Sequence, residues 1–301
     1  MSVFPSFPDF KVLSLEDRDF VHERLWGFQP QTSELTFVNL YIWRSYYKFQ
    51  WSVYKDWLFV VSTRDGDVYA LPPVGPAPYS EPARVLLDWL AGAFPGVSPH
   101  IARAGKRVAD DLAGMAEFSV TPAREHFDYV YNSHDLGQLA GRKYSKKRNH
   151  ISQFLRAYEY SYAPLTGDLV PGCLNLAEVW CKQRLCNEDI SLQHEFCGIR
   201  DALTHLDILH LAGGVILVEG KVQAFALGEL LNAQTAVVHI EKANPNFNGI
   251  YPMITREFSN RRWSDVAYIN REQDLGDLGL RQAKESYYPE FLVEKFSVRP
   301  A

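Results

Sequence analysis

An asparagine, an arginine and two acids stand close together after a predicted strand near the carboxyl end of the chain. The strand covers residues 265–269, and it is followed by Asn270, Arg271, Glu272 and Asp274. Functional loops collect at the carboxyl ends of strands in α/β sheets. We predict that Glu272 and Asp274 are catalytic, because they can attract and orient a cationic amine and one of them can accept its proton.

The helix predicted after this loop adds polar side chains to the same site. The residues predicted to bind substrate here are Asn270, Arg271, Arg281, Lys284 and Tyr287. A structural alternative stays open, because Arg281 is spaced i,i+4 from both Asp277 and Glu285, which is the spacing of ordinary helix ion pairs. Under that alternative the charges only tie the loop to the last helix and to a basic helix.

A second stretch whose residues could take part in catalysis or binding is the predicted strand 235–243, "TAVVHIEKA". Strand alternation places His239 and Glu241 on one face and Lys242 on the other. A His and a Glu on one face can orient an amine or take its proton, so we predict His239 to be catalytic and Glu241 and Lys242 to bind substrate. The alternative is a surface pair at the end of the sheet. Gly249 follows just before a helix, where free backbone N–H groups suit an anion.

The third stretch is a run of cations in residues 141–158. The residues predicted to bind substrate here are Lys143, Tyr144, Lys146, Lys147, Arg148 and Asn149. If the helix begins near Gly141, the helix dipole disfavours each cation by roughly 0.3–1 kcal/mol, so an anion such as phosphate, a carboxylate cluster or RNA is expected to compensate. A helix that begins at Asp135 would weaken this argument and leave a solvated basic face, which is the alternative.

Composition limits the classes of function. A chain of 301 residues suits two domains, and its net charge of −5 excludes a general polyanion binder, so tRNA would have to bind through the local basic patch. The four cysteines form no CxxC pair and fit no common zinc spacing. We therefore predict no metal site, and we expect reduced thiols.

The termini and the apolar runs indicate a soluble, cytoplasmic protein. The N-terminus lacks the basic and apolar regions of a signal peptide. The best apolar run, residues 211–218, is too short to span a bilayer.

Two separate runs of helices and strands must position these residues. The elements predicted in the first run are a helix over 33–49 with Ser33 as its N-cap, strands over 50–55, 57–63 and 67–73, and a helix over 82–94. A boundary between Thr121 and Asn132 gives domains 1–125 and 126–301, and the second carries the predicted site.

The second run begins with helices and then becomes rich in strands. Its predicted elements are a meander of strands 214–220, 222–230 and 235–243, a helix over 249–263, the strand 265–269, a final helix and a last strand over 291–298. This order predicts an α/β fold with a mixed sheet covered by helices.

Three of these segments carry a family resemblance. They are 139–154 ("LAGRKYSKKRNHISQF"), 228–244 ("GELLNAQTAVVHIEKAN") and 269–289 ("INREQDLGDLGLRQAKESYYP"). They resemble a family of soluble bacterial proteins that is similar to the C-terminal domain of phosphatidylglycerol lysyltransferases. The similarity extends over most of the chain, and it implies two tandem GNAT-like acyltransferase domains.

The resemblance also implies an activity. It implies transfer of an aminoacyl group from aminoacyl-tRNA to an amine or hydroxyl acceptor, such as a small amine or a lipid headgroup, with no bound cofactor. The full-length lipid enzymes have membrane spans and this sequence shows none, which disfavours phosphatidylglycerol as the acceptor.

Two other functions stay open. One is a coenzyme A-dependent N-acyltransferase on the same fold, with acyl-CoA as donor. Such enzymes carry a glycine-rich turn after the fourth strand, but residues 244–252 ("NPNFNGIYP") contain only Gly249, which leaves less room for a pyrophosphate. The other is a non-catalytic binding module that keeps the GNAT-like fold, since a fold does not fix a function.

Overall fold

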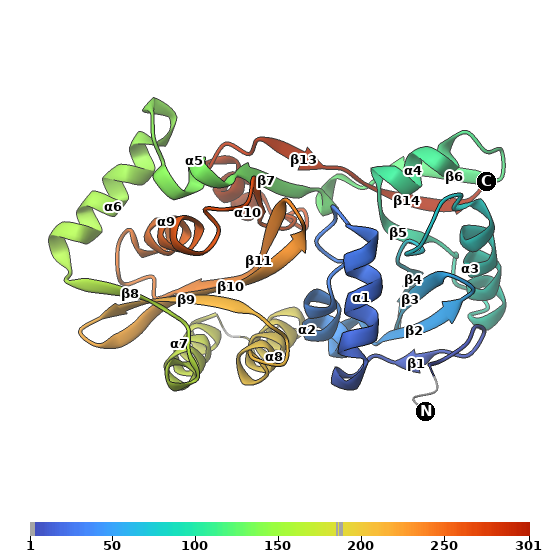
Figure 1. The fold of residues 1–301 in the computed structure, drawn as a ribbon, viewed down its shortest axis with the longest axis horizontal. Helices are drawn as coiled ribbons and strands as arrows, with labels where there is room; N and C mark the ends of the chain where they lie inside the picture. The colour runs from blue at the N-terminus through green and yellow to red at the C-terminus, as the bar shows by residue number, and fades with distance from the viewer. Residues whose placement is uncertain (1–3, 185, 187–188) are drawn as a thin grey trace. The chain divides into compact units, whose positions relative to one another are not determined.

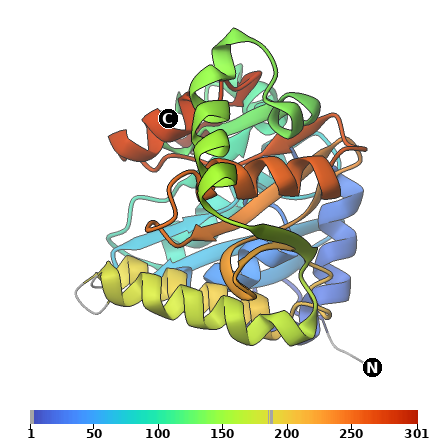
Figure 2. The ribbon, with the colours of Figure 1, turned by 90° about the vertical axis from the view of Figure 1, so that its left-hand side faces the viewer.

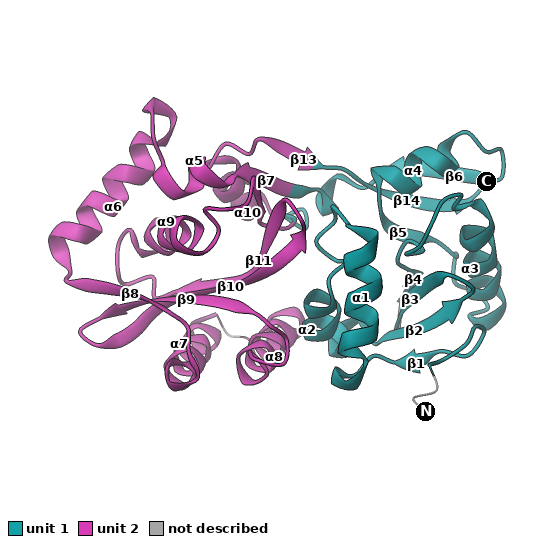
Figure 3. Ribbon diagram, viewed as in Figure 1, with its two compact units in different colours: residues 1–128, 273–276, 293–301 teal, residues 129–272, 277–292 magenta. Residues whose placement is uncertain are grey.

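The computed structural model describes residues 4–184, 186 and 189–301 (Figure 1). The chain forms two compact units, shown in Figure 3. Unit 1 contains residues 1–128, 273–276 and 293–301, and unit 2 contains residues 129–272 and 277–292. Each unit is built on a mixed sheet with helices, so the predicted α/β fold with mixed sheets is confirmed.

Unit 1 is built on a seven-stranded sheet of order β1-β2-β3-β4-β5-β14-β6. Its strands are β1 (Lys11–Val12), β2 (Phe49–Tyr54), β3 (Trp57–Arg64), β4 (Asp67–Ala70), β5 (Ile101–Gly105), β6 (Phe118–Pro122) and β14 (Lys295–Pro300). Its helices are α1 (Arg18–Phe28), α2 (Phe37–Tyr47), α3 (Ser80–Ala93) and α4 (Lys106–Ala113). The predicted strands and the α3 helix are confirmed, while α1 and α4 lie outside the predicted elements.

The start of α2 corrects the predicted N-cap. The helix begins at Phe37, and the Thr36 hydroxyl caps it by accepting the Asn39 N–H at 3.1 Å. Ser33 is instead committed to Asp128, whose carboxylate accepts the Ser33 N–H at 2.8 Å and its hydroxyl at 2.9 Å. Because Ser33 is hydrogen-bonded to the Asp128 carboxylate, it does not act as the N-cap of α2.

Unit 2 is built on a seven-stranded sheet of order β13-β7-β12-β11-β10-β9-β8. Its strands are β7 (Asp128–Asn132), β8 (Tyr160–Pro164), β9 (Ala212–Val218), β10 (Lys221–Asn232), β11 (Thr235–Ala243), β12 (Tyr268–Asn270) and β13 (Phe291–Val293). Its helices are α5 (Ser133–Gln138), α6 (Ser145–Ala157), α7 (Val170–Gln183), α8 (Ile190–Thr204), α9 (Ile250–Arg262) and α10 (Leu278–Glu285).

The predicted meander and crossover of unit 2 are present. Strands β9, β10 and β11 pair antiparallel, and α9 then returns the chain so that β12 pairs parallel to β11. Helix α9 packs on one face of the sheet with α6 beside it, while α7 and α8 cover the opposite face (Figure 2). The core between α9 and the sheet includes the buried side chains of Phe154, Ile216, Ile254, Phe258 and Ile269.

The last predicted strand, 291–298, is two strands in two sheets. β13 lies at an edge of the unit 2 sheet, and β14 inserts between β5 and β6 of unit 1. Val298 of β14 is fully buried there. The division into domains 1–125 and 126–301 stays a prediction, and the compact units assign residues 293–301 to unit 1.

In the described part of the chain, no helix combines the length and the apolar character needed to cross a bilayer.

A buried lysine joins four segments of unit 1 that are distant in sequence. Lys295 is 0% exposed, and its Nζ donates to Asp128 Oδ1 at 2.6 Å and to Glu34 Oε2 at 2.6 Å. It also contacts Gln273 Oε1 at 3.1 Å. Buried charges are tolerated only when they are paired and hydrogen-bonded, so this cluster fixes β14 in its sheet.

We predict that Lys295→Met lowers the free energy of unfolding by about 3–5 kcal/mol, because Glu34 and Asp128 lose the cation that they share. Urea unfolding followed by circular dichroism measures the change. Lys106→Met is the matched control, because Lys106 forms an exposed pair with Asp110 on α4 and should matter little. Equal effects of the two substitutions would contradict the assigned role of Lys295.

Candidate functional site

The three predicted stretches meet in unit 2, where the pairing of two parallel strands ends. β11 and β12 are paired over Thr235–Val237 and Tyr268–Asn270, and β11 then continues to Ala243. Beyond this point the polar side chains of β11 face those that follow β12. The carboxyl end of parallel strands is where α/β folds bind ligands.

A β-bulge determines the direction of His239. Leu227 pairs with Ile240 and Gly228 pairs with Val238, so His239 is the extra residue of β11. Such bulges redirect side chains and interrupt strand alternation. The predicted pairing of His239 with Glu241 rested on unbroken alternation, and the structure gives the two side chains different partners.

His239 lies between two carboxylates, and these three residues are named the histidine cluster. Its Nδ1 is 2.8 Å from Glu272 Oε1, its Nε2 is 3.0 Å from Glu229 Oε1, and its side chain is 1% exposed. Burial alone would lower the pKa of His239, but the hydrogen bonds to Glu229 and Glu272 raise it to about 9. Both ring nitrogens then donate at neutral pH, so His239 has no lone pair with which to accept a proton.

Arg271 bridges from the end of β12 to β11. Its Nη2 donates to Glu241 Oε1 at 3.1 Å, and Glu241 also accepts the Thr255 hydroxyl at 2.9 Å. The guanidinium lies 4.9 Å from the ring centroid of Tyr287. Arg271 Nη1 is buried and has no hydrogen-bond partner among the described residues. A buried donor of this kind is expected to meet a ligand or water.

Lys147 of α6 joins the same group, and Lys147, Glu241, Arg271 and Tyr287 are named the arginine cluster. Lys147 Nζ donates to Ser286 Oγ at 2.7 Å and lies 3.8 Å from the ring centroid of Tyr287. Burial lowers the pKa of Lys147 to about 8, and the nearby Arg271 adds to this while Glu241 opposes it. With Lys147 protonated, the cluster carries one positive charge in excess.

The other residues of the basic stretch are divided among separate roles. Helix α6 begins only at Ser145, after a 3-10 turn that separates it from α5. Lys143 pairs with Asp135 at 2.9 Å, and Arg148 donates to two backbone carbonyls just after α5 at 2.5 and 2.6 Å. Tyr144 is buried and donates to the Tyr287 carbonyl at 3.0 Å. Lys146 and Asn149 are exposed, as are Lys143 and Arg148.

The loop after β12 is held by its own polar groups. Asn270 is fully buried and its Oδ1 accepts the Glu272 N–H at 2.8 Å, while Glu272 adopts a left-handed φ of 59°. Lys284 of α10 donates to the carbonyls of Arg271 and Glu272, and Arg281 lies half-buried on the same helix. These contacts support a positioning role for Asn270 and Lys284.

Asp274 and Glu272 belong to different compact units and have different partners. Asp274 lies in unit 1, is fully buried, accepts the Gly276 N–H at 2.8 Å and pairs with Arg124 at 3.3 Å. Glu272 lies in unit 2 and pairs with His239. The catalytic roles given to these acids stay predictions.

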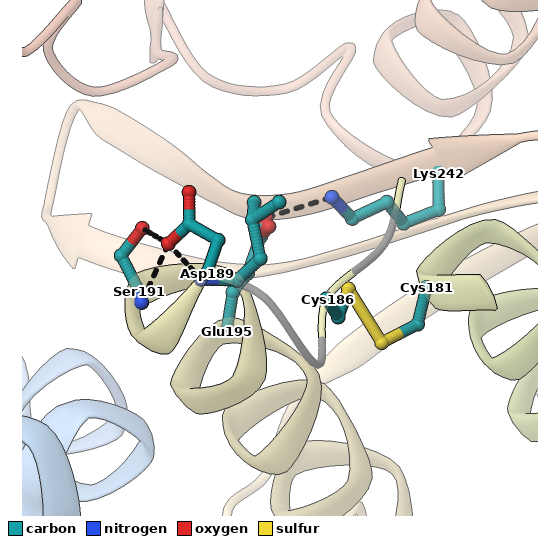
Figure 4. Close-up of a disulfide and its surroundings, with 7 residues drawn as sticks. Cys181, Cys186, Asp189, Ser191, Glu195 and Lys242 are labelled. Atoms are coloured by element: carbon teal, nitrogen blue, oxygen red, sulfur yellow. Dashed lines mark hydrogen bonds and ion pairs between the residues drawn. A yellow bond between two sulfur atoms is a disulfide. The ribbon is translucent and has the colours of Figure 1, made fainter. Parts of the chain in front are cut away.

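Lys242 points to the opposite face of the sheet from Glu241. Its Nζ donates to Glu195 Oε1 of α8 at 2.7 Å and lies 3.4 Å from the ring centroid of Trp180 on α7. Figure 4 shows Lys242 reaching toward Glu195 near the disulfide. The structure therefore does not bring Lys242 together with the arginine cluster.

The expectation of reduced thiols is wrong for two of the four cysteines. Cys181 at the end of α7 and Cys186 form a disulfide, and their Cα atoms are 5.2 Å apart, which is within the usual range (Figure 4). Cys173 and Cys197 are free. Among the described residues, no group of three or more His, Cys, Asp or Glu side chains has the arrangement of a metal site.

Helix α6 covers the start of α9. The carbonyl oxygen of His150 lies 2.1 Å from the position that a Cβ of Gly249 would occupy, and the φ of Gly249 is +87°. The Ile250 N–H donates to the Phe247 carbonyl at 3.1 Å, and Pro252 has no N–H. This helix start therefore offers fewer donors to an anion than the sequence alone indicated.

We predict that His239 makes the stability of unit 2 depend on pH. Because its folded pKa is raised from 6.5 to about 9, its contribution is complete below pH 6.5 and is lost as the pH rises through 9, by on the order of 3 kcal/mol. His239→Gln should be less stable at pH 7 and should lack this decline. Urea unfolding from pH 6 to 9.5 measures both, and the exposed His134→Gln should behave like the wild type. A wild type and a His239→Gln protein with parallel pH profiles would argue against the ion-paired imidazolium.

Comparison with known proteins places the chain in a family. The model for "Phosphatidylglycerol lysyltransferase, C-terminal" matches residues 27–299. A conserved Bacteroides thetaiotaomicron protein of unknown function is 33% identical, with a TM-score of 0.90 over 99% of this chain and 100% of that chain. L-PGS of Bacillus licheniformis is 11% identical, with a TM-score of 0.63 over 96% and 93% of the two chains, and shows the same fold.

A curated relative from Mycoplasmoides gallisepticum, itself uncharacterised, is 23% identical over 63% of this chain, and the match spans 64% of that relative's length. The family match covers most of the described fold, including both charge clusters. The chain belongs to the family of the C-terminal domain of phosphatidylglycerol lysyltransferases.

Proposed function

We propose that this protein transfers an aminoacyl group from an aminoacyl-tRNA to an amine or hydroxyl acceptor. The observation that carries the proposal is the arginine cluster, where Arg271 Nη1 is a buried donor with no hydrogen-bond partner among the described residues. A ligand that presents an anionic or polar oxygen to this donor fits the arrangement.

An aminoacyl ester is such a ligand. Its carbonyl oxygen becomes an oxyanion during attack, and its ribose carries a phosphate. Both suit the arginine cluster, where Arg271 Nη1 is a buried donor with no partner among the described residues.

The reaction balances without a redox partner or a cofactor. The lone pair of the acceptor nitrogen or oxygen attacks the ester carbonyl carbon, and a tetrahedral oxyanion forms. The carbon–oxygen bond to the ribose then breaks, and the acceptor's proton ends on the ribose oxygen. Catalysis of such a step rests mainly on positioning and on oxyanion stabilisation.

The start of α9 favours this donor over acyl-CoA. Coenzyme A-dependent relatives of this fold need room and free N–H groups there for a pyrophosphate. Here the His150 carbonyl lies against Gly249, and Asn248 donates to Gln153 Oε1 of α6 at 2.9 Å. A second contact, between the rings of Tyr158 and Phe247 at 4.8 Å, holds the same segments together.

The matched family is named for lysyl transfer to phosphatidylglycerol, which supports an aminoacyl donor and leaves the acceptor to be found. Exposed Lys146 and Asn149 on α6 are proposed to contact the tRNA backbone. Contacts of this kind weaken as salt concentration rises.

We predict that the purified protein moves radiolabelled amino acid from charged tRNA to an acceptor in a panel of small amines and lipid vesicles. The double variant Arg271→Gln with Glu241→Gln removes both charges of the ion pair and so avoids an unpaired buried charge. It should keep the melting temperature within a few degrees and lower the transfer rate by about 100-fold or more.

Arg262→Gln is the matched control, because Arg262 is exposed on α9 and stacks on Trp263, away from both clusters. It should transfer at the wild-type rate. Turnover of acyl-CoA together with inert aminoacyl-tRNA would overturn the proposal, as would full activity in the double variant.

A further inference from the structure

Among the described residues, four lysines are buried or half-buried, and they differ in their partners. Lys284 donates to two backbone carbonyls. Lys295 contacts Glu34 and Asp128, and Lys242 contacts Glu195. Lys147 is half-buried, yet among the described residues its Nζ contacts a hydroxyl and an aromatic ring and no carboxylate lies within ion-pair distance. A lysine placed among neutral groups changes its protonation state more readily than one locked to a carboxylate.

The two charges near Lys147 have opposite effects on its pKa, and the effect of the cation Arg271 is the larger. Arg271 contacts the ring of Tyr287 that Lys147 also contacts, so the two cations are near neighbours. The nearby acid, Glu241, already accepts from Arg271 and from Thr255. Burial raises the pKa of Tyr287 to about 12, so this phenol stays neutral and supplies no negative charge. Repulsion from Arg271 and loss of water both favour the neutral amine.

We propose that Lys147 is the proton carrier of the transfer reaction, an inference that rests on the proposed function. Neutral Lys147 Nζ accepts the proton of the acceptor nitrogen or oxygen as the new bond to the carbonyl carbon forms. The resulting ammonium faces the oxyanion beside Arg271. It then gives the proton to the ribose oxygen as the ester bond breaks, which returns Lys147 to its neutral form.

The other titratable groups of the site are less suited to this task. Both ring nitrogens of His239 are engaged by carboxylates, and proton acceptance by Glu272 would break its ion pair with His239. Glu241 would likewise lose its ion pair with Arg271. Lys147 can change its charge while its contacts to Ser286 and Tyr287 persist, because a neutral amine keeps N–H groups that donate to Ser286 Oγ.

The test is the pH dependence of single-turnover transfer from charged tRNA by the wild type and by Lys147→Arg. Arginine keeps the positive charge and cannot deprotonate, so it separates proton transfer from charge. The wild-type rate should rise with pH, reach half of its maximum near pH 8, where Lys147 is half neutral, and level off at higher pH. Lys147→Arg should bind charged tRNA with unchanged affinity, lose about 100-fold or more in rate, and lose that rise.

Lys221→Arg is the matched control, because Lys221 is an exposed lysine at the start of β10 in the same unit. It should keep both the rate and the pH profile of the wild type. Residue-resolved amine labelling across pH, read by mass spectrometry, provides a readout that needs no activity. Lys147 should gain reactivity near pH 8, and Lys221 should do so at higher pH.

The outcomes separate this inference from the proposed function. A wild type that transfers nothing from any charged tRNA rejects the proposed function, and the inference falls with it. Active transfer with an unimpaired Lys147→Arg variant rejects the inference alone. Equal labelling midpoints for Lys147 and Lys221 also overturn it.

Discussion

The ion pair between Arg271 and Glu241 connects β12 to β11 after their shared backbone pairing has ended. Several other contacts meet at the same residue. The Arg271 N–H donates to the Tyr129 carbonyl at 2.9 Å, and its own carbonyl accepts Lys284 of α10. The ring of Tyr287 lies by the guanidinium, and Lys147 of α6 contacts that ring. Backbone and side chain of Arg271 together therefore connect a strand end, a loop and two helices.

Charge is buried in two different ways in this protein. In unit 1, Lys295 and Arg103 lie among Glu34 and Asp128, so positive and negative charges balance within a core that water does not reach. In unit 2, the arginine cluster holds two cations, Lys147 and Arg271, and one carboxylate, Glu241. Since an unbalanced buried charge costs free energy, it is expected where a ligand supplies the missing counterpart. This contrast is the physical basis for the structural role of Lys295 and for the binding role proposed for the arginine cluster.

Much of unit 2 was predictable from local patterns. The meander, the α9 crossover and β12 follow from alternation, turn residues and the order of elements, and the structure has all of them. The arginine cluster draws on the three stretches whose residue types indicated chemistry. Two partners were missed, Glu229 and Thr255, because each looks like an ordinary residue of a strand or helix. The hairpin register that brings β10 beside β11 is the signal that points to Glu229.

By itself the sequence determined most of the strands and helices of unit 2, the family, and the stretches that supply Arg271, Glu241 and Lys147, since these depend on local periodicity and residue type. Only the tertiary structure decided how the charges are paired. The bulge at His239 gives His239 and Glu241 different partners. The sheet changes after Val293, so Lys295 lies in unit 1. Ser33 is hydrogen-bonded to Asp128 and therefore does not cap α2. Charge pairing depends on distances between segments far apart in the chain, and local sequence does not specify those distances.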